Sequence, residues 1–425
     1  MTFKRRDFVK WLSASAVLSG GIGHAGAATT RPVGRVLVIG GGFAGATAAK
    51  YLRMWSPDIE VTLVERNPGF VSCPLSNRVL AGVMRIEDLT RNYDGLQSVH
   101  GVKIVRDQAM SIDAASHSVR LAGGGLLHYD RLIVAPGVDL LPEEVAGLDS
   151  APAQARILHA WKAGPQTVAL RRQLEAMRDG GVFALTIPKA PYRCPPGPYE
   201  RACQVAWYFK THKPRSKVLI LDANEDVVSK KALFTKIWAE RYPGIVEYRP
   251  NSELVGVDVG TLTARLTFDD VKADVLNIIP PQRAGNIARD AGLITVNNKW
   301  CGVDFLTYES LALKNVHVLG DAIMAAPLMP KSGHMANQHA KVCAAAIVAL
   351  LHGEEVNAQP LLTNTCYSFV SDKDVIHVAS VHAYNPDKKT MEVVSGASGV
   401  STEANELEGH YAEAWGRNIW ADMLG

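Results

Sequence analysis

The stretch Arg35-Val-Leu-Val-Ile-Gly-Gly-Gly-Phe-Ala-Gly45 indicates the fold of this chain. It opens with a β-branched apolar run, typical of a buried parallel strand, and a helical stretch follows from Ala46 to about Met54. Between them Gly40, Gly42 and Gly45 form a G-x-G-x-x-G pattern in the strand–loop–helix context of a dinucleotide-binding unit. Gly40 is expected to permit a tight turn, Gly42 to let backbone approach a pyrophosphate, and Gly45 to let the helix pack against the strand.

An acidic residue completes this first unit. The next apolar run, Glu60–Val64, predicts a second parallel strand, and it ends at Glu65. A carboxylate at the end of that strand is placed to accept a hydrogen bond from a ribose hydroxyl. Glu65 is therefore a candidate ligand of the dinucleotide.

Two later segments favour FAD over NAD as the dinucleotide. Tyr129–Gly137 resembles the strand and turn that close the FAD domain in flavoproteins with two dinucleotide-binding domains, and Asn315–Asp321 resembles their second FAD motif. In those proteins the aspartate, here Asp321, hydrogen-bonds the ribitol chain. A helix expected from about Gly333 directs its positive N-terminal end at the flavin ring, and Lys331 just before it is a candidate for further positive charge.

A second strand–loop–helix unit follows, but its loop is different. An amphipathic helix over 165–178 and a strand over 182–187 lead into a loop rich in proline, 188–201, where a second glycine pattern is expected in a pyridine-nucleotide reductase. Proline has no N–H to offer a phosphate and cannot adopt positive φ. A helix from about Pro198 to Lys210 and a strand from Lys217 to Asp222 keep the Rossmann-like layout. The unit is therefore badly suited to NAD(P)H.

The N-terminus predicts export. Residues 4–10 read Lys-Arg-Arg-Asp-Phe-Val-Lys, an apolar stretch runs from Trp11 to about Ile22, and Ala25-Gly-Ala27 fits a cleavage site. The R-R-x-F-x-K pattern resembles the bacterial twin-arginine signal, so we expect residues 1–27 to be removed and the mature chain to be periplasmic. The apolar stretch is too short for a stable anchor, and no later segment reaches 18 apolar residues.

Composition excludes several other classes. The chain has 425 residues, of which 47% are hydrophobic and 20% charged, as in an ordinary globular protein of two or three domains. The formal net charge is +3, and four basic residues against one acidic residue within 1–27 account for it. The near-neutral remainder argues against nucleic-acid binding.

The six cysteines are Cys73, Cys194, Cys203, Cys301, Cys343 and Cys366. No C-x-x-C pair occurs, so no metal site is expected, and no C-x-x-C-H motif occurs, so any covalent haem must lie on a partner subunit. Cys194 stands beside Arg193 just before a predicted helix, and both features are expected to lower its thiol pKa. Cys203 and Cys343 fall in helical runs and are expected to be buried apolar residues.

The sequence resembles the flavoprotein subunit of flavocytochrome c sulfide dehydrogenase over nearly the whole mature chain. The most specific stretches are Gly40–Gly45, Cys73–Asn77, Tyr192–Arg201, Ile279–Gly285, Met329–Gly333 and Asn364–Ser368. The resemblance implies covalent attachment of FAD to Cys73 through the flavin 8α-methyl group, a redox-active disulfide between Cys194 and Cys366, and a position for Trp415 close to the flavin. Pro74 departs from the family pattern, and Cys203 is an extra thiol near Cys194.

The resemblance also implies an architecture. We expect an α/β chain with two Rossmann-like dinucleotide-binding domains in a glutathione-reductase-like FAD fold and a smaller C-terminal domain. The FAD domain is expected to comprise 31–150 and 291–360, the second Rossmann-like domain 151–290, and the C-terminal domain 361–425.

The implied activity is FAD-dependent sulfide oxidation in the periplasm, to sulfur or polysulfide, with electrons passing to a c-type cytochrome subunit in a heterodimer. The closest alternative is a sulfide:quinone oxidoreductase, which needs an apolar membrane-facing C-terminal surface, whereas residues 402–425 carry five acidic residues and one arginine. An NADH-dependent reductase conflicts with the proline-rich loop. A non-catalytic flavin electron-relay module is a third alternative, and it needs no cysteine pair near the flavin.

Overall fold

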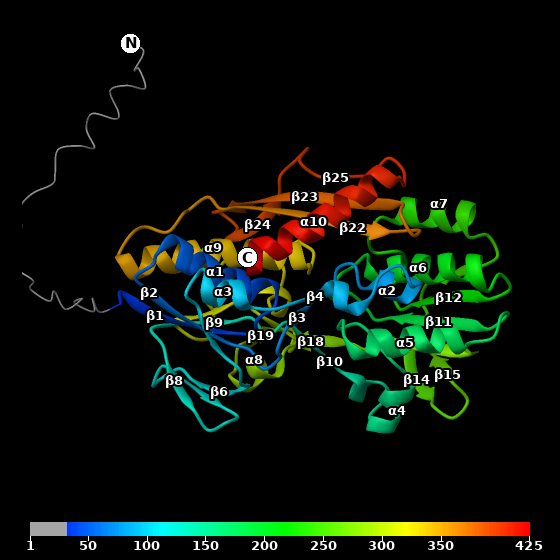
Figure 1. The fold of residues 1–425 in the computed structure, drawn as a ribbon, viewed down its shortest axis with the longest axis horizontal. Helices are drawn as coiled ribbons and strands as arrows, with labels where there is room; N and C mark the ends of the chain where they lie inside the picture. The colour runs from blue at the N-terminus through cyan, green and yellow to red at the C-terminus, as the bar shows by residue number, and fades with distance from the viewer. Residues whose placement is uncertain (1–31) are drawn as a thin grey trace, which may run out of the picture. The chain divides into compact units, whose positions relative to one another are not determined.

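The computed structural model describes residues 32–425. The apolar run before the glycine-rich loop forms the middle strand of a five-stranded parallel sheet. In spatial order the strands are β21 (Val316–Val318), β9 (Arg131–Val134), β1 (Gly34–Ile39), β2 (Ile59–Val64) and β5 (Lys103–Val105). Helices α1 (Phe43–Trp55) and α9 (Gly333–His352) pack together on one face of this sheet (Figure 1). The antiparallel strands β6 (Ala109–Asp113), β7 (Ser118–Leu121) and β8 (Leu126–His128) lie on the other side.

A second parallel sheet has the order β13 (Val246–Arg249), β12 (Lys217–Asp222), β11 (Val182–Ile187) and β17 (Val275–Ile278). Side chains alternate between its faces, as the period of a strand requires. Phe183 and Leu185 pack with the helices α5 (Pro165–Ala176), α6 (Gly197–His212) and α7 (Lys231–Arg241). Ala184 faces the opposite core, formed with α4 (Ala151–Arg156) and the antiparallel sheet β14 (Leu254–Asp258), β15 (Thr263–Leu266) and β16 (Asp270–Lys272).

Short elements connect these layers. An antiparallel pair, β10 (Val138–Leu140) with β18 (Gln282–Ala284), forms where the chain leaves the first sheet and returns from the second. The remaining short strands pair as β3 (Phe70–Val71) with β4 (Thr90–Arg91) and β19 (Ile294–Val296) with β20 (Trp300–Cys301). The remaining short helices are α2 (Asn77–Ala81), α3 (Asp94–Ser98) and α8 (Asn286–Asp290).

The C-terminal segment spans both parallel sheets. Its long hairpin, β22 (Leu361–Phe369) and β23 (Val375–Asn385), runs along one side of the molecule with β24 (Thr390–Val393) and β25 (Gly399–Val400) (Figure 1). Strand β22 contacts α9 of the first unit and α6 of the second. The last helix, α10 (Glu406–Leu424), crosses back to α1. Residues near the chain end are therefore held against both units.

Contacts group Val33–Gly425 into one compact unit. The predicted α/β class with two Rossmann-like units is confirmed, because each parallel sheet is built from buried apolar strands covered by helices. The first sheet takes β21 from far along the chain, beside β9. The predicted signal segment, 1–27, lies outside the described residues.

Candidate functional site

A cavity of about 1090 Å³ opens where the parallel strands of the first sheet end. The residues directly after β1, β2, β9 and β21, which are Gly40, Glu65, Ala135 and Leu319, all line it. The carboxyl ends of parallel strands are where open α/β sheets bind ligands. The other walls come from the loop before α6, from β22 and from α10.

The structure brings most of the sequence-predicted site residues to this cavity. Its lining includes Gly40, Gly42, Glu65, Cys73, Cys194, Asp321, Cys366 and Trp415. Gly45 and Lys331 are not part of the lining.

The glycine-rich loop needs its glycines for different reasons. Gly40 has φ +97, and an added Cβ would lie 2.4 Å from the carbonyl oxygen of Ala135. A Cβ on Gly45 would lie 1.8 Å from the carbonyl oxygen of Gly40, so α1 can approach β1 this closely only with glycine there. A Cβ on Gly42 would meet no protein atom within 4 Å. Gly42 therefore faces open cavity at the start of α1, where a pyrophosphate would approach.

Glu65 is positioned by the same loop. Its Oε2 accepts a hydrogen bond of 2.8 Å from the backbone N–H of Gly41, and its Oε1 accepts from the backbone N–H of Asn67 at 2.7 Å. These bonds orient the carboxylate at the cavity wall, at the end of β2. The placement suits a ribose hydroxyl as a further donor.

Asp321 lines the cavity from the 3₁₀ turn that follows β21. Its Oδ1 is buried and has no hydrogen-bond partner within the described chain, and burial raises the pKa of the carboxyl group. A buried acceptor without a donor is costly unless a ligand satisfies it. The hydroxyls of a ribitol chain provide such donors, so the cavity fits a flavin dinucleotide.

Lys331 lies behind the cavity wall and does not line the cavity itself. Its Nζ donates to the backbone carbonyls of Asp321, at 3.0 Å, and Ile323, and lies 3.7 Å from the ring centroid of Trp300. The residue is buried, and burial lowers the pKa of its ammonium group to about 8. The sequence made Lys331 a candidate for positive charge near the flavin, and the structure places that charge behind the Asp321 turn, which it supports from the protein side.

The N-terminus of α9 points positive charge into the site. Ser332 caps the helix through its Oγ, which accepts from the backbone N–H of Met335 at 3.0 Å, and Gly333 and His334 line the cavity. Nδ1 of His334 accepts a hydrogen bond from the backbone N–H of Thr365 at 3.0 Å, and burial lowers the pKa of the ring. Unpaired N–H groups at a helix start favour negative charge, which a reduced flavin ring carries.

Trp415 reaches the cavity from α10. Its ring lies 5.9 Å from the ring of His334 and 6.2 Å from that of Tyr367, between centroids. The cavity wall is thus completed by the last helix, far along the chain from the glycine-rich loop.

Cys73 lies between the two units. Its Sγ accepts a hydrogen bond of 3.4 Å from the backbone N–H of Ala163, and the guanidinium of Arg193 lies beside it. Burial opposes the charged form of Arg193, yet nearby Cys73 and Asp321 leave its pKa raised. Arg193 also lines the cavity, so a permanent positive charge stands next to this thiol.

Cys194 occupies a strained turn before α6. Its φ is +58, its backbone N–H donates to the carbonyl of Lys331 at 2.8 Å, and its Sγ would lie 2.9 Å from a Cβ on Gly197. The sequence predicts a lowered thiol pKa, but burial, and then the neighbouring Cys366, raise it. The prediction is wrong because removal from water outweighs the attraction of Arg193.

Cys366 stands on the buried face of β22, between Asn364 and Ser368. The amide of Asn364 donates to its Sγ at 3.4 Å. Burial raises the pKa of this thiol too, while Lys230 opposes that rise. All six cysteines are free thiols, so the structure brings Cys194 and Cys366 to one cavity without joining them.

The other thiols are structural in their placement. Cys203 and Cys343 are fully buried within α6 and α9, as predicted, and Cys301 is fully buried in β20. The indole N–H of Trp238 donates to the Sγ of Cys203 at 3.3 Å. None of these three cysteines lines the cavity.

The sequence did not predict the buried hydrogen-bond network that Glu200 and Arg201 form next to the cysteines. Glu200 lines the cavity, accepts from the backbone N–H of Phe369 at 3.0 Å and from the amide of Asn77 at 2.9 Å, and has its pKa raised by burial. Arg201 donates to Asn77 at 3.0 Å and to the side chain of Asn277 at 2.8 Å. Two adjacent charged residues near the start of α6 were the available signal for this network.

In the second unit, the acid at the end of β12 is already paired with protein donors. Asp222 is fully buried, and its Oδ2 accepts from the hydroxyls of Tyr199 at 2.7 Å and Tyr248 at 3.2 Å. Its Oδ1 accepts from the backbone and the side-chain amide of Asn224. Both oxygens of Asp222, which occupies the place of Glu65 in this unit, therefore already accept hydrogen bonds from protein donors.

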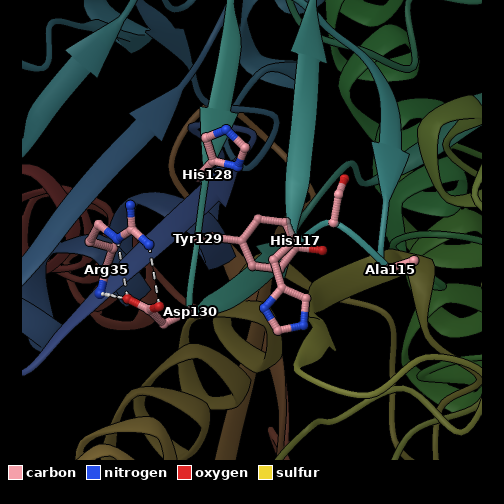
Figure 2. A pocket seen from close by; sticks show the side chains of 7 residues that line it. Arg35, Ala115, His117, His128, Tyr129 and Asp130 are labelled. Atoms are coloured by element: carbon pink, nitrogen blue, oxygen red, sulfur yellow. Dashed lines mark hydrogen bonds and ion pairs between the residues drawn. The ribbon is translucent and has the colours of Figure 1, made fainter.

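A second hollow, about 340 Å³, lies away from these residues, between Arg35 of β1, the turn before β7 and the end of β8. Figure 2 shows Arg35 paired with Asp130. The ring of His117 stacks on that of Tyr129, with 5.3 Å between the ring centroids. Over residues 32–425 no cluster of three or more metal-ligating side chains occurs. Within the same described range no helix is long and apolar enough to cross a membrane.

Comparisons with known proteins agree along the chain. Three family descriptions match: "Pyridine nucleotide-disulphide oxidoreductase" at 34–164, "Sulfide dehydrogenase [flavocytochrome c] flavoprotein chain, central" at 167–280, and "Flavocytochrome c sulphide dehydrogenase, flavin-binding" at 358–424. The "Sulfide dehydrogenase [flavocytochrome c] flavoprotein chain" of Chlorobaculum thiosulfatiphilum is 62% identical over 45 residues, which are 11% of this chain and 94% of that sequence.

More distant relatives share the fold. The mitochondrial sulfide:quinone oxidoreductase of Mus musculus is 22% identical over 70% of this chain and 68% of its own. The solved sulfide:quinone oxidoreductase of Aquifex aeolicus superposes with a TM-score of 0.74 at 19% identity, covering 92% of this chain and 91% of that one. The Chlorobaculum relative, of which this chain covers 94% at 62% identity, establishes the family. The chain belongs to the flavoprotein chains of flavocytochrome c sulfide dehydrogenase.

Proposed function

We propose that this chain oxidises sulfide with FAD, using Cys194 and Cys366 as a redox-active disulfide. The observation that carries the proposal is the convergence of both thiols and the dinucleotide loop on one cavity. The printed names of the relatives, a sulfide dehydrogenase flavoprotein chain and sulfide:quinone oxidoreductases, agree with this reaction. The satisfied Asp222 and the proline-rich loop of the second unit argue against NAD(P)H as the electron donor.

The reaction begins with hydrosulfide and the oxidised cysteine pair. Attack on one sulfur of the disulfide breaks the S–S bond, and leaves a persulfide on that cysteine and a thiolate on the other. Arg193 at the cavity wall attracts the anionic substrate. Re-forming the disulfide with loss of sulfane sulfur requires a two-electron acceptor, and FAD, when bound, would supply that chemistry.

Residues around the cavity divide the work of holding FAD. Gly40, Gly42 and the start of α1 suit the pyrophosphate, Glu65 the ribose, and Asp321 the ribitol chain. The start of α9 and Trp415 suit the flavin ring.

The test is anaerobic reduction of the purified holoprotein. Sulfide is expected to bleach the oxidised flavin band, whereas NADH is expected to leave it unchanged. In Cys194→Ser, the rate of flavin bleaching by sulfide is expected to fall by at least about 100-fold, because the disulfide is lost. Dithionite is still expected to reduce the flavin of this variant. Bleaching by NADH alone would overturn the proposal in favour of a pyridine-nucleotide reductase.

We further propose that Cys73 binds FAD covalently. After denaturation and precipitation of the holoprotein, the yellow chromophore is expected to stay with the polypeptide, and mass spectrometry is expected to place it on the peptide that contains Cys73. Cys73→Ala is expected to release its FAD under the same treatment. Release of all flavin from the unaltered protein would contradict covalent attachment.

The proposed electron acceptor is a c-type cytochrome subunit in a heterodimer in the periplasm. The name of the Chlorobaculum relative supports this acceptor, and the twin-arginine pattern at Arg5 and Arg6 supports the location. Steady-state sulfide oxidation is expected to reduce cytochrome c in preference to a soluble quinone analogue. Preference for the quinone would instead favour the sulfide:quinone alternative that the structural likeness to the Aquifex protein raises.

Lysine substitution at both Arg5 and Arg6 is expected to leave the unprocessed chain in the cytoplasmic fraction, because twin-arginine export reads that pair.

A further inference from the structure

A buried lysine stands behind one of the two cavity cysteines and has no part in the mechanism described so far. Lys230 is about 8% exposed and directly precedes α7, with its backbone in the left-handed region at φ +54. Its Nζ donates to the carbonyl of Cys366 at 2.9 Å and to the hydroxyl of Ser368 at 2.7 Å. A third donor contact reaches the carbonyl of Ile376 on β23 at 3.4 Å.

Strand geometry places this ammonium on the thiol side of β22. Side chains two residues apart point to the same face of a strand, so the hydroxyl of Ser368 and the thiol of Cys366 share one face. Lys230 contacts that hydroxyl, and therefore its charge lies on the face that carries the sulfur. The amide of Asn364, two residues before the thiol on the same face, donates to the Cys366 Sγ.

The titratable groups around Lys230 come from several elements that pack against it. They are Cys366 on β22, Glu200 on α6, Cys194 before α6, and Glu408 on α10. No carboxylate lies within salt-bridge distance of its Nζ among the described residues. Burial lowers the pKa of Lys230 to about 8, and the nearby Cys366 and Glu200 oppose that shift.

We infer that Lys230 is a positioning residue that stabilises the thiolate of Cys366, so that Cys366 is the sulfur released when the disulfide opens and Cys194 is the sulfur that takes up the incoming sulfide. The better-stabilised thiolate is the better leaving group in thiol–disulfide exchange. The step balances: the incoming hydrosulfide sulfur bonds to Cys194 Sγ, the S–S bond breaks, and its electron pair leaves on Cys366 Sγ. The second half of the inference rests on the proposed function, whereas the first half concerns the thiol alone.

The first experiment needs no sulfide. The FAD-loaded protein is reduced with a phosphine, and alkylation of Cys366 by iodoacetamide is followed by mass spectrometry from pH 6 to pH 10. Lys230→Met is expected to slow alkylation of Cys366 at pH 8 by about tenfold or more, because an adjacent opposite charge shifts a thiol pKa by a unit or more. Lys230→Arg is expected to restore most of the rate.

A matched control separates charge from structure. Lys213 is also a buried lysine whose Nζ is bound only by backbone carbonyls, at the end of α5, and it does not line the cavity. Lys213→Met is expected to leave the alkylation profile of Cys366 unchanged. An unchanged profile in Lys230→Met, or an equal loss in Lys213→Met, would overturn the role of Lys230.

The second experiment locates the persulfide. The oxidised holoprotein is exposed briefly to one equivalent of sulfide, alkylated and digested, and the added sulfur is expected on Cys194 with plain alkylation on Cys366. Sulfur on Cys366 would overturn the assignment. Absence of added sulfur on either cysteine would count against the proposed function, while the alkylation result still decides whether Lys230 acts on the thiol.

Discussion

The two parallel-sheet units of this chain share the same strand–loop–helix frame, but the loops between their first strand and helix differ in chemistry. In the first, the loop from Gly40 to Gly45 presents backbone and open cavity at the start of α1. In the second, the loop before α6 carries prolines and turns at Cys194, so it presents a thiol instead of backbone N–H groups.

The acids after the second strands repeat this contrast. Glu65 faces the cavity and accepts hydrogen bonds from backbone N–H groups. Asp222 is fully buried and accepts hydrogen bonds from the hydroxyls of Tyr199 and Tyr248. The difference teaches that a Rossmann-like frame does not by itself bind a nucleotide. In each unit, the loop after the first strand decides the kind of site. A loop with unpaired backbone N–H groups can bind phosphate, whereas a proline-rich loop without them can present a thiol.

The largest expected effect is at Gly45. Gly45→Ala places a Cβ 1.8 Å from the carbonyl oxygen of Gly40, a backbone atom that cannot move without breaking the loop. We expect destabilisation by more than about 3 kcal/mol and loss of FAD-loaded protein. Flavin-to-protein absorbance and the midpoint of thermal unfolding measure it. Gly399→Ala, where a Cβ meets nothing within 4 Å, is the control. Normal flavin content in Gly45→Ala would show that the loop is not required as described.

The paired acids come next. Asp222→Asn is expected to destabilise the protein by about 2 kcal/mol, because a new amide donor faces existing donors. Its sulfide-driven flavin reduction is expected to stay normal. Glu65→Gln is expected to do the reverse: it lowers flavin content with a smaller loss of stability. The free energy of unfolding in urea and the flavin content of both variants test this prediction. If both variants lost stability and flavin to the same extent, the two acids would not differ in role as described.

A smaller effect is expected at Gly42. In a Cys73→Ala background, where flavin binding is reversible, Gly42→Ala is expected to weaken FAD binding about tenfold, equal to about 1.4 kcal/mol. The added methyl meets no protein atom but occupies space at the start of α1 where the pyrophosphate approaches. Fluorescence titration of the apoprotein measures the affinity. Unchanged affinity would place the phosphates elsewhere in the cavity.

The smallest effect is a pH dependence at Glu200. Burial raises its pKa in the folded protein above the usual value of 4.5, so the folded state binds this proton more tightly than the unfolded state, and the unaltered protein loses stability as pH rises from 4.5 through the folded pKa. Glu200→Gln does not titrate, and it loses about 1 kcal/mol at pH 5 because both carboxylate oxygens accept from donors. The stability gap is therefore expected to shrink between pH 5 and pH 8.

Urea unfolding at the two pH values measures that gap. Glu240→Gln on the exposed side of α7 is the control, with no change in gap expected. A gap that widens with pH would mean that Arg201 and Lys230 stabilise the Glu200 carboxylate more than burial opposes it.

The sequence by itself determined the frame and much of the cavity. The β-branched strands, the spacing of Gly40, Gly42 and Gly45, and the prolines before α6 act through local backbone geometry, which residues close in the chain decide. For that reason both parallel units were predicted correctly. The buried positions of Cys203 and Cys343 followed from helical periodicity in the same way.

Only the tertiary structure decided the chemistry around the thiols. The pKa of Cys194 is raised because segments distant in sequence exclude water from it, which no neighbouring residue reveals. Lys331 faces Trp300 and backbone carbonyls, and Lys230 reaches Cys366 from another unit. Desolvation and charge act through space, so these groups acquire their roles only when β22, α6 and α10 are packed together.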